Sequence, residues 1–180
     1  MKKNKSPSIL VVGPDGVGKT TMVKKMSEMT NMPTFKCPNE KQIFKSSGAE
    51  SLHFDYMLTH FIEQTGVSFI SDRAYICEAA YSMVFNRETN NLLLDEIDKR
   101  HSKLGTKILY LYSSIQPFEE DDIVPSDKYF DVKSAYDYLF DKWCRCECLR
   151  IDTARMLKEY KNGKDISSVF AMDCLELMNI

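Results

Sequence analysis

The sequence predicts an α/β fold: a three-layer sandwich in which a parallel sheet of about five strands carries helices on both faces. Short apolar runs alternate along the chain with longer segments whose apolar residues recur at helical spacing, an order typical of parallel strands joined by crossover helices. The chain has 180 residues, of which 43% are hydrophobic. This is enough for one domain with a full core. We therefore expect a single domain over residues 1–180.

Each predicted strand is a short run rich in β-branched, aromatic or other apolar residues. Right-handed crossovers place the ends of parallel strands at one edge of the sheet, so functional loops are expected there. The predicted strands are Ile9–Val12, Thr34–Cys37, Val67–Ser71, Lys107–Tyr112 and Leu149–Asp152.

The predicted helices carry apolar residues three or four positions apart, which gives each of them one buried face. Gly66 and Gly105 mark the ends of two of them. We expect residues 1–7 to form a flexible tail and residues 41–48 a loop. The predicted helices are Thr20–Met29, Glu50–Gln64, Ala74–Phe85, Asn91–Leu104, Ser134–Cys146 (mostly helical) and Asp165–Met178.

The stretch from Gly13 to Thr20 fits the phosphate-binding loop pattern G-x-x-x-x-G-K-[ST], and it lies between the first predicted strand and the first predicted helix. Glycines let the backbone N–H groups point at phosphate oxygens, the lysine reaches the outer phosphates, and the threonine hydroxyl holds Mg²⁺. The following helix adds its positive N-terminal end. The pattern predicts a P-loop NTPase fold that binds ATP and Mg²⁺. The expected ATP-binding residues are Gly13, Asp15, Gly16, Val17, Gly18, Lys19, Thr20 and Thr21.

A second candidate site, Ser71-Asp72-Arg73, directly follows the third predicted strand. A carboxylate there can coordinate Mg²⁺ or accept a hydroxyl proton, and a guanidinium matches phosphate geometry. An Asp-Arg pair is also common as a surface ion pair or helix cap, but its position at the same sheet edge as the phosphate loop favours an active-site role. We expect Lys19, Asp72 and Arg73 to be catalytic, with Thr20 and Asp72 directed at the metal.

Two stretches resemble the thymidylate kinases. The phosphate loop is similar to theirs, which often have an acidic residue at the position of Asp15. The sequence Asp72-Arg-Ala-Tyr-Ile-Cys-Glu-Ala-Ala-Tyr81 resembles that family's Asp-Arg-aromatic motif and the Ala-Tyr pair that follows it. It also looks like phage-type thymidylate-kinase-like proteins, in which a glutamate lies at about the place of Glu78. The good match covers about residues 8–30 and 67–85.

The resemblance implies ATP-dependent phosphoryl transfer to a deoxynucleoside monophosphate, giving the diphosphate. It implies that Asp15 contacts the 3′-hydroxyl of the acceptor, that Arg73 grips its phosphate, and that Tyr81 lies against the deoxyribose. Phe54 is a candidate for stacking on the base and is equally well explained as a core residue. Glu78 is a further candidate for substrate binding.

The chain departs from that family in two places. Residues 113–142, the candidate lid region, contain no arginine and carry the acidic run Glu119–Asp122, which we expect to be a solvated loop. We predict that this segment closes over ATP and that a guanidinium arrives from outside it. Arg145 is favoured over Arg150, although a charge on a helix surface is the simpler explanation of Arg145. The second departure is Leu58, which occupies the approximate place of the family's base-binding arginine.

Two other functions remain open. A deoxynucleoside kinase would need a carboxylate near the acceptor 5′-hydroxyl, and Glu40 is available after the second predicted strand. A low-turnover ATP-binding switch module would agree with the absence of lid arginines. A GTPase is disfavoured because the sequence has no Asn-Lys-x-Asp motif for reading guanine.

Composition limits the partners. The 24 basic and 26 acidic residues give a net charge of −2, which offers no global field for nucleic acid or an anionic membrane. We expect a small-molecule nucleotide substrate, no nucleic acid and no membrane, and a homodimer is possible. The six cysteines are interpreted as reduced thiols of a cytoplasmic protein. Cys144-Arg-Cys-Glu-Cys148 lacks the C-x₂-C spacing of zinc sites, so these thiols are expected to be buried or partly buried packing residues.

Overall fold

A computed structural model describes residues 7–36, 49–117 and 126–180. Over these residues the chain forms one five-stranded sheet with the order β2-β3-β1-β4-β5, and every strand pair is parallel. This confirms the predicted α/β fold. Glu40, most of the expected tail, the expected loop at 41–48 and the acidic run lie outside the described residues. The strands are β1 (Ile9–Val12), β2 (Thr34–Lys36), β3 (Ile70–Asp72), β4 (Lys107–Tyr112) and β5 (Glu147–Asp152).

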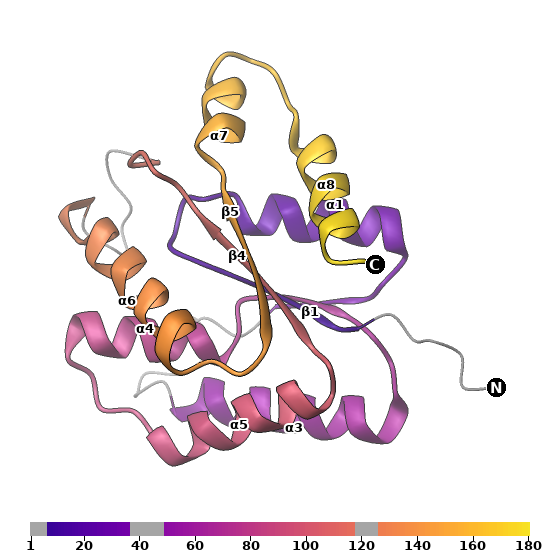
Figure 1. Cartoon of the computed structure of the whole chain (residues 1–180), viewed down its shortest axis with the longest axis vertical. Helices are drawn as coiled ribbons and strands as arrows, with labels where there is room; N and C mark the ends of the chain where they lie inside the picture. Colours follow the sequence, from indigo (N-terminus) through magenta and orange to yellow (C-terminus); the bar gives the residue numbers. More distant parts are fainter. Residues whose placement is uncertain (1–6, 37–48, 118–125) are drawn as a thin grey trace.

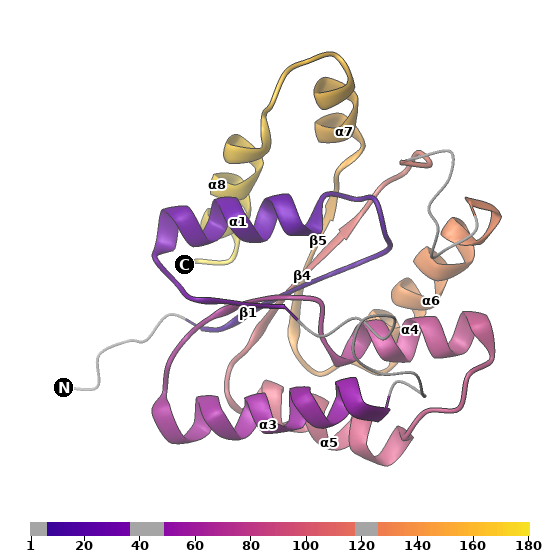
Figure 2. The same cartoon turned by 180° about the vertical axis from the view of Figure 1, so that it is seen from behind.

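Helices cover both faces of the sheet (Figures 1 and 2). One layer contains α1, α7 and α8, and the opposite layer contains α3, α4, α5 and α6. None of the described helices combines the length and the apolar character that a membrane span requires. The helices are α1 (Lys19–Thr30), α3 (Ala49–Thr65), α4 (Tyr75–Phe85), α5 (Asn91–Lys103), the 3₁₀ turn η1 (Ser126–Lys128), α6 (Tyr129–Lys142), α7 (Ala154–Lys161) and α8 (Ser167–Leu177).

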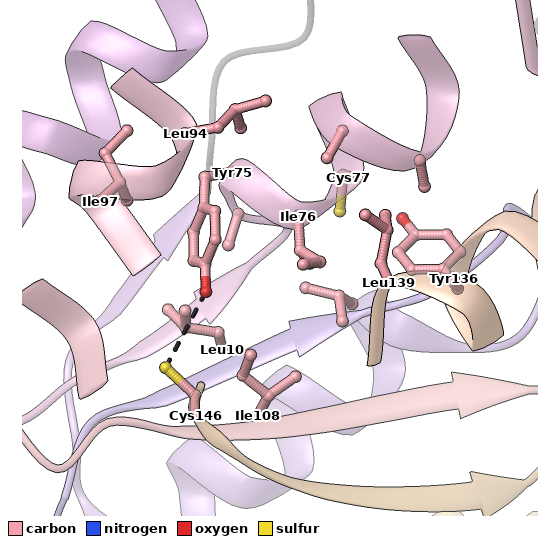
Figure 3. Close-up of a cluster of buried hydrophobic side chains, with 14 of the residues drawn as sticks. Leu10, Tyr75, Ile76, Cys77, Leu94, Ile97, Ile108, Tyr136, Leu139 and Cys146 are labelled. Atoms are coloured by element: carbon pink, nitrogen blue, oxygen red, sulfur yellow. Dashed lines mark hydrogen bonds between the residues drawn. The ribbon is translucent and has the colours of Figure 1, made fainter. Parts of the chain in front are cut away.

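The central strand β1 supplies both cores because successive side chains of a strand point to opposite faces. Ile9 and Val11 belong to the core shared with α1 and α8, whereas Leu10 and Val12 belong to the core under α3 to α6. All four side chains are buried. Figure 3 shows Leu10 in the second core, below the residues of α4. A continuous apolar run therefore suits this strand, as expected for a sheet buried on both faces.

Strands β1 and β4 have the predicted bounds, but β3 begins at Ile70 where the sequence predicted Val67. The difference arises from pairing. Strand β1 begins at Ile9, and its parallel register matches Ile9 to Ile70 and Val11 to Asp72. Val67 precedes this ladder and is exposed. Asp72 is consequently the last residue of β3, where the sequence placed it just after the strand.

The prediction for the segment before β5 was wrong at both ends. Helix α6 begins at Tyr129 and ends at Lys142, where the sequence predicted a helix over Ser134–Cys146. Its buried residues Tyr129, Val132, Tyr136 and Leu139 follow helical spacing, so the start was readable from the sequence. The chain then turns into β5, which starts early because Glu147 pairs with Lys107. Helix α7 was not predicted.

Candidate active site

The phosphate loop joins β1 to α1, and two of its glycines are required by backbone conformation, one of them also by close packing. Gly13 has a φ of 144°, and a Cβ there would lie 1.9 Å from the carbonyl oxygen of Leu111 in β4. Gly18 caps α1 with a φ of 88°, and a Cβ there would lie 2.6 Å from the terminal methyl of Met156. Both positions need glycine because their positive φ strains any other residue, and at Gly13 a side chain would also collide with the backbone of β4. The loop therefore lies against β4 and α7.

Two oxygen ligands meet where α1 begins. Thr20, the second residue of α1, donates a hydrogen bond of 2.7 Å from Oγ1 to Asp72 Oδ2. Asp72 ends β3, which is hydrogen-bonded to β1, so sheet pairing brings the carboxylate beside the loop. Hydroxyl and carboxylate oxygens are the ligands that Mg²⁺ prefers. The residues present thus fit a magnesium ion, and Thr20 and Asp72 are the side chains that could hold it.

Asp15 connects the phosphate loop to the β3–α4 segment. Its Oδ1 lies 3.3 Å from Lys19 Nζ and accepts a hydrogen bond from the Arg73 guanidinium. Its Oδ2 accepts a hydrogen bond of 3.0 Å from the Tyr81 hydroxyl. Lys19 also donates to the carbonyl oxygen of Pro14. Four of the residues predicted for substrate and phosphate therefore form one contiguous network.

The charges of this network hold Asp15 ionised. Burial would raise the pKa of the Asp15 carboxyl, but the Lys19 and Arg73 charges and the Tyr81 hydrogen bond leave it lowered. Burial, and next the charge of Arg73, lower the pKa of Lys19. Burial would also lower the pKa of Arg73, yet the Asp15 carboxylate leaves it raised. The site concentrates two cations around one carboxylate.

Arg73 adopts a backbone conformation that is uncommon for a residue with a side chain. Its φ is 75°, in the left-handed region. Its N–H donates to the carbonyl oxygen of Val11 at 3.0 Å, and the Ser71 hydroxyl donates to its carbonyl oxygen at 2.8 Å. Such strain costs on the order of 1–3 kcal/mol and clusters at functional sites. These two hydrogen bonds keep the guanidinium near the loop.

The other acceptor candidates lie on α3 and α4. Glu78 is buried on α4, where it accepts a hydrogen bond of 2.7 Å from Ser82 and lies 3.7 Å from the Arg87 guanidinium. Phe54 is half-buried on α3 and packs against the core under α3 to α6. Burial, followed by the Asp15 charge, raises the pKa of Tyr81, so this residue acts as a neutral hydroxyl.

The sequence analysis missed Asp55, beside Phe54 on α3. Its side chain is 1% exposed, and among the described residues neither carboxylate oxygen has a hydrogen-bond partner of normal geometry. Burial raises its pKa to about 8, opposed by the nearby backbone amide of Tyr75. The available signal was an aspartate on the face of α3 that also carries the buried residues Leu52 and Ile62. Buried, unpaired carboxyls are rare and often functional.

Arg145 precedes β5, as predicted, but the structure does not bring it to the phosphate loop. Its guanidinium lies 2.7 Å from Asp98 Oδ2 and 2.8 Å from Asp95 Oδ1, both on α5. The phosphate loop follows the C-terminal end of β1, whereas Arg145 lies before the N-terminal end of a parallel strand. The two are therefore at opposite edges of the sheet. Arg150 pairs with Asp141 at 2.6 Å.

The candidate lid region is divided by the structure. Residues 118–125 lie outside the described residues, while 129–142 form α6, whose buried face packs against the core. Lys128 and Lys133, two lysines of this region, pair with Asp131 and Asp137.

The five-stranded parallel sheet and the strand–loop–helix phosphate site define a P-loop NTPase. Within this class, the model of the ATPase family associated with various cellular activities (AAA) matches residues 9–131, more than half of the chain. The chain belongs to this family. Among curated proteins, none matches the chain significantly.

Solved structures with a similar fold include several kinases. The YorR protein of Bacillus subtilis in complex with phosphorylated GDP is 17% identical, with a TM-score of 0.69 and 95% of each chain covered. Deoxyadenosine kinase from M. mycoides with bound dATP is 14% identical, with a TM-score of 0.61, 94% of this chain and 99% of that one covered. Shikimate kinase from Acinetobacter baumannii in complex with shikimate is 15% identical, with a TM-score of 0.56 and coverage of 96% and 92%. At these identities the likeness shows a shared fold.

Proposed function

We propose that this protein is a kinase that transfers the γ-phosphoryl group of ATP to a deoxynucleoside monophosphate. The observation that carries the proposal is the Asp15 network, in which the loop lysine Lys19 and the second cation Arg73 converge on one carboxylate. A phosphoryl-transfer site needs one cation for the transferred group and another for an anionic acceptor. A module that only binds ATP does not need the second cation.

In this proposal the protein contributes positioning and fixed charge. The backbone of the phosphate loop and Lys19 hold the outer phosphates, and Arg73 aligns the acceptor phosphate for in-line attack. When bound through Thr20 and Asp72, Mg²⁺ supplies charge neutralisation on the phosphates of ATP. Because Lys19 donates to Asp15 and Pro14 in this structure, its ammonium has to exchange those partners for phosphate oxygens.

The same network supports a deoxyribose acceptor. Asp15 is ionised and has lone pairs left to accept a hydrogen bond from a 3′-hydroxyl. The Tyr81 ring, buried beside it on α4, offers an apolar surface to the sugar. Phe54 is the proposed contact to the base, and Glu78 is a further candidate for substrate binding. In its most specific form, the proposal is that the protein acts like a thymidylate kinase and uses that kind of nucleotide as the acceptor.

A deoxynucleoside kinase is the second candidate, and one comparison favours it. A protein of similar fold is a deoxyadenosine kinase, and one of its structures has the products dCMP and dCDP bound. Such an enzyme needs a carboxylate at the acceptor 5′-hydroxyl in place of a cation for a monophosphate. The Arg73 guanidinium argues for the monophosphate, since its planar fork matches a phosphate group and a free nucleoside offers it no such partner.

An ADP-release assay with ATP and Mg²⁺ tests the proposal across a panel of nucleosides and their monophosphates. We expect turnover with a 2′-deoxynucleoside monophosphate and little with the matching free nucleoside. Equal or faster turnover of the nucleoside would establish the alternative. ATP binding without turnover of any acceptor would indicate a switch module, for which the pairing of Lys128 and Lys133 with carboxylates is the supporting feature.

A further inference from the structure

Three potential metal ligands meet at the sheet edge opposite the phosphate loop. They are Asp98 of α5 and the thiols of Cys144 and Cys146, which lie between α6 and β5. One ligand atom of each residue lies within 4.8 Å of those of the other two. Asp98 is fully buried, Cys146 is buried and Cys144 is partly exposed. The Asp98 carboxylate is the third member of this cluster, and the Cys-x-Cys spacing in the sequence does not predict it.

The protein scaffold fixes these three residues. The backbone N–H of Arg145 lies 3.3 Å from both carboxylate oxygens of Asp98, which places the flanking cysteines beside the carboxylate. The Tyr75 hydroxyl donates to Asp98 Oδ1 at 2.7 Å and lies 3.9 Å from each of the two sulfurs. Figure 3 shows Tyr75 extending from the start of α4 toward Cys146. The cluster is thus organised before any ion binds.

A buried histidine ring stacks on Tyr75, the residue whose hydroxyl contacts all three potential ligands. His101 follows Asp98 by one turn of α5, and its ring stacks on Tyr75 with centroids 5.5 Å apart. Its Nδ1 pairs with Thr106, but its Nε2 has no hydrogen-bond partner among the described residues. Burial lowers the pKa of His101 to about 4, so the imidazole is neutral. His101 is not one of the three clustered ligands, so it packs beside them as a neutral ring.

We propose that Asp98, Cys144 and Cys146 form a binding site for one thiophilic divalent cation, with Zn²⁺ as its ligand. Two sulfurs and a carboxylate oxygen are an accepted donor set for zinc, and a fourth tetrahedral position remains for solvent from the partly exposed Cys144 side. With Zn–S bonds of about 2.3 Å, tetrahedral geometry needs sulfurs about 3.8 Å apart. The two sulfurs, which lie within 4.8 Å of each other, therefore have to approach by about 1 Å at most.

The charge of the site favours a dication. Without metal, the Asp98 carboxylate is balanced by the Arg145 guanidinium. Binding releases two thiol protons, Zn²⁺ + 2 RSH → Zn(SR)₂ + 2 H⁺, so the buried region keeps its net charge. Arg145 then lies outside the ligands as the hydrogen-bonded partner of the metal-binding carboxylate, an arrangement that orients such ligands. Arg145, which the sequence predicted to reach the phosphates from outside the lid region, would serve this structural site instead.

Cobalt titration of the reduced, metal-free protein without nucleotide tests the proposal, because Co²⁺ reports its own ligands. We expect one equivalent to bind with a sulfur-to-cobalt charge-transfer band and the intense visible bands of tetrahedral cobalt, and Zn²⁺ to displace it. Cations at Thr20 and Asp72 have only oxygen ligands and give neither signal. This readout is independent of kinase activity. The metal-site proposal can therefore fail while the proposed function holds, and the proposed function can fail while the metal site is present.

Variants assign the signal to residues. Cys144→Ser and Cys146→Ser should each weaken Zn²⁺ binding by about 100-fold or more, since even outer partners of a metal contribute about 10- to 100-fold. Cys174→Ser, in the core beside α1 and α8, is the matched control and should bind normally. Saturating Zn²⁺ should raise the Tm of the wild type by about 5 °C or more and leave that of the double serine variant unchanged.

Two results would overturn the proposal. One is cobalt binding that is weak, octahedral in its spectrum or equally affected by Cys174→Ser. The other is a Cys144–Cys146 disulfide that forms in air while the reduced protein binds no metal. Circular dichroism tests whether each variant is folded. If a variant is unfolded, the cobalt spectrum of the wild type alone decides whether the protein has a site with sulfur ligands.

Discussion

Thr20 donates a 2.7 Å hydrogen bond to Asp72 although 52 residues separate them in the chain. The contact exists because β1 and β3 are neighbours in the sheet, with Val11 opposite Asp72. Thr20 follows β1 by way of the phosphate loop, and Asp72 ends β3. Two oxygens from distant segments thus meet where the proposed kinase would hold Mg²⁺.

We expect Asp72→Asn to lower turnover by about 100-fold or more and to raise the Mg²⁺ concentration that gives half-maximal activity, because an amide is a weaker ligand for a hard cation. Steady-state ADP release over a series of Mg²⁺ concentrations measures both effects. Asp131→Asn, which changes an exposed carboxylate on α6, is the control. An unchanged Mg²⁺ dependence in Asp72→Asn would exclude this residue from the metal site.

Lys19→Ala should abolish phosphoryl transfer while the protein stays folded. Among the described residues, the hydrogen-bond partners of the Lys19 ammonium are Pro14 and Asp15, which both belong to the phosphate loop. Its loss removes the positive charge that would stabilise the transferred phosphoryl group, so we expect turnover to fall on the order of 100-fold or more. Lys24→Ala, an exposed residue of the same helix, should keep full activity. Near-normal turnover in a folded Lys19→Ala protein would contradict the central claim of the proposal.

Arg73→Ala should act on the acceptor and not on ATP. Loss of a charge-assisted contact costs about 1.5–3 kcal/mol, so we expect KM for the acceptor monophosphate to rise about 10- to 100-fold while KM for ATP is little changed. Arg100→Ala removes a guanidinium that pairs with Glu63 and Glu96 on the helix surface, and it should leave both constants unaltered. Equal increases in the two constants would point to a general disturbance of the loop.

Gly13→Ala should destabilise the fold by several kcal/mol, since the new Cβ would lie 1.9 Å from the Leu111 carbonyl oxygen and the backbone cannot move without breaking the β1–β4 register. Gly105→Ala is the matched control. Its φ is 69°, but nothing lies within 4 Å of the new Cβ, so only the left-handed strain of about 1–2 kcal/mol applies. Urea unfolding of the two variants measures the difference in stability. Equal losses in the free energy of unfolding would show that backbone strain, and not the collision with Leu111, determines the effect at Gly13.

The raised pKa of the buried Asp55 carboxyl predicts that the stability of the fold depends on pH. Burial raises the pKa of Asp55 to about 8, whereas an unfolded aspartate titrates at about 3.9. Between these values the folded protein keeps a proton that the unfolded chain has released. The free energy of unfolding therefore falls as the pH rises from about 4 to about 8, by up to about 1.4 kcal/mol per pH unit from this group.

Asp55→Asn should remove that slope and raise the free energy of unfolding at pH 8 by roughly 2–5 kcal/mol. Denaturant titrations at a series of pH values test this. Asp131→Asn again serves as the control, because an exposed carboxylate with a nearby lysine should leave the slope in place. A parallel pH profile in Asp55→Asn and the wild type would mean that Asp55 is ionised in the folded protein.

The parts of the fold that the sequence predicted well are those that depend on local spacing. The bounds of β1 and β4 and the helical nature of α1, α3, α4, α5 and α8 follow from runs and periodicity within single segments. The start of α6 was also local information, in the spacing of Tyr129, Val132 and Tyr136, but it was misread. The late start of β3 was different in kind, because the ladder with β1 sets it.

The sequence by itself determined the phosphate loop and the sheet class, because a glycine-lysine-threonine pattern and alternating apolar periods are properties of neighbouring residues. Only the tertiary structure decided that Arg73 and Tyr81 meet Asp15 and that Asp72 meets Thr20. It likewise assigned Arg145 to Asp98 and not to the phosphates. The physical reason is that strand order and register fix which chain ends share a sheet edge, and residues tens of positions apart acquire contacts that no local pattern encodes.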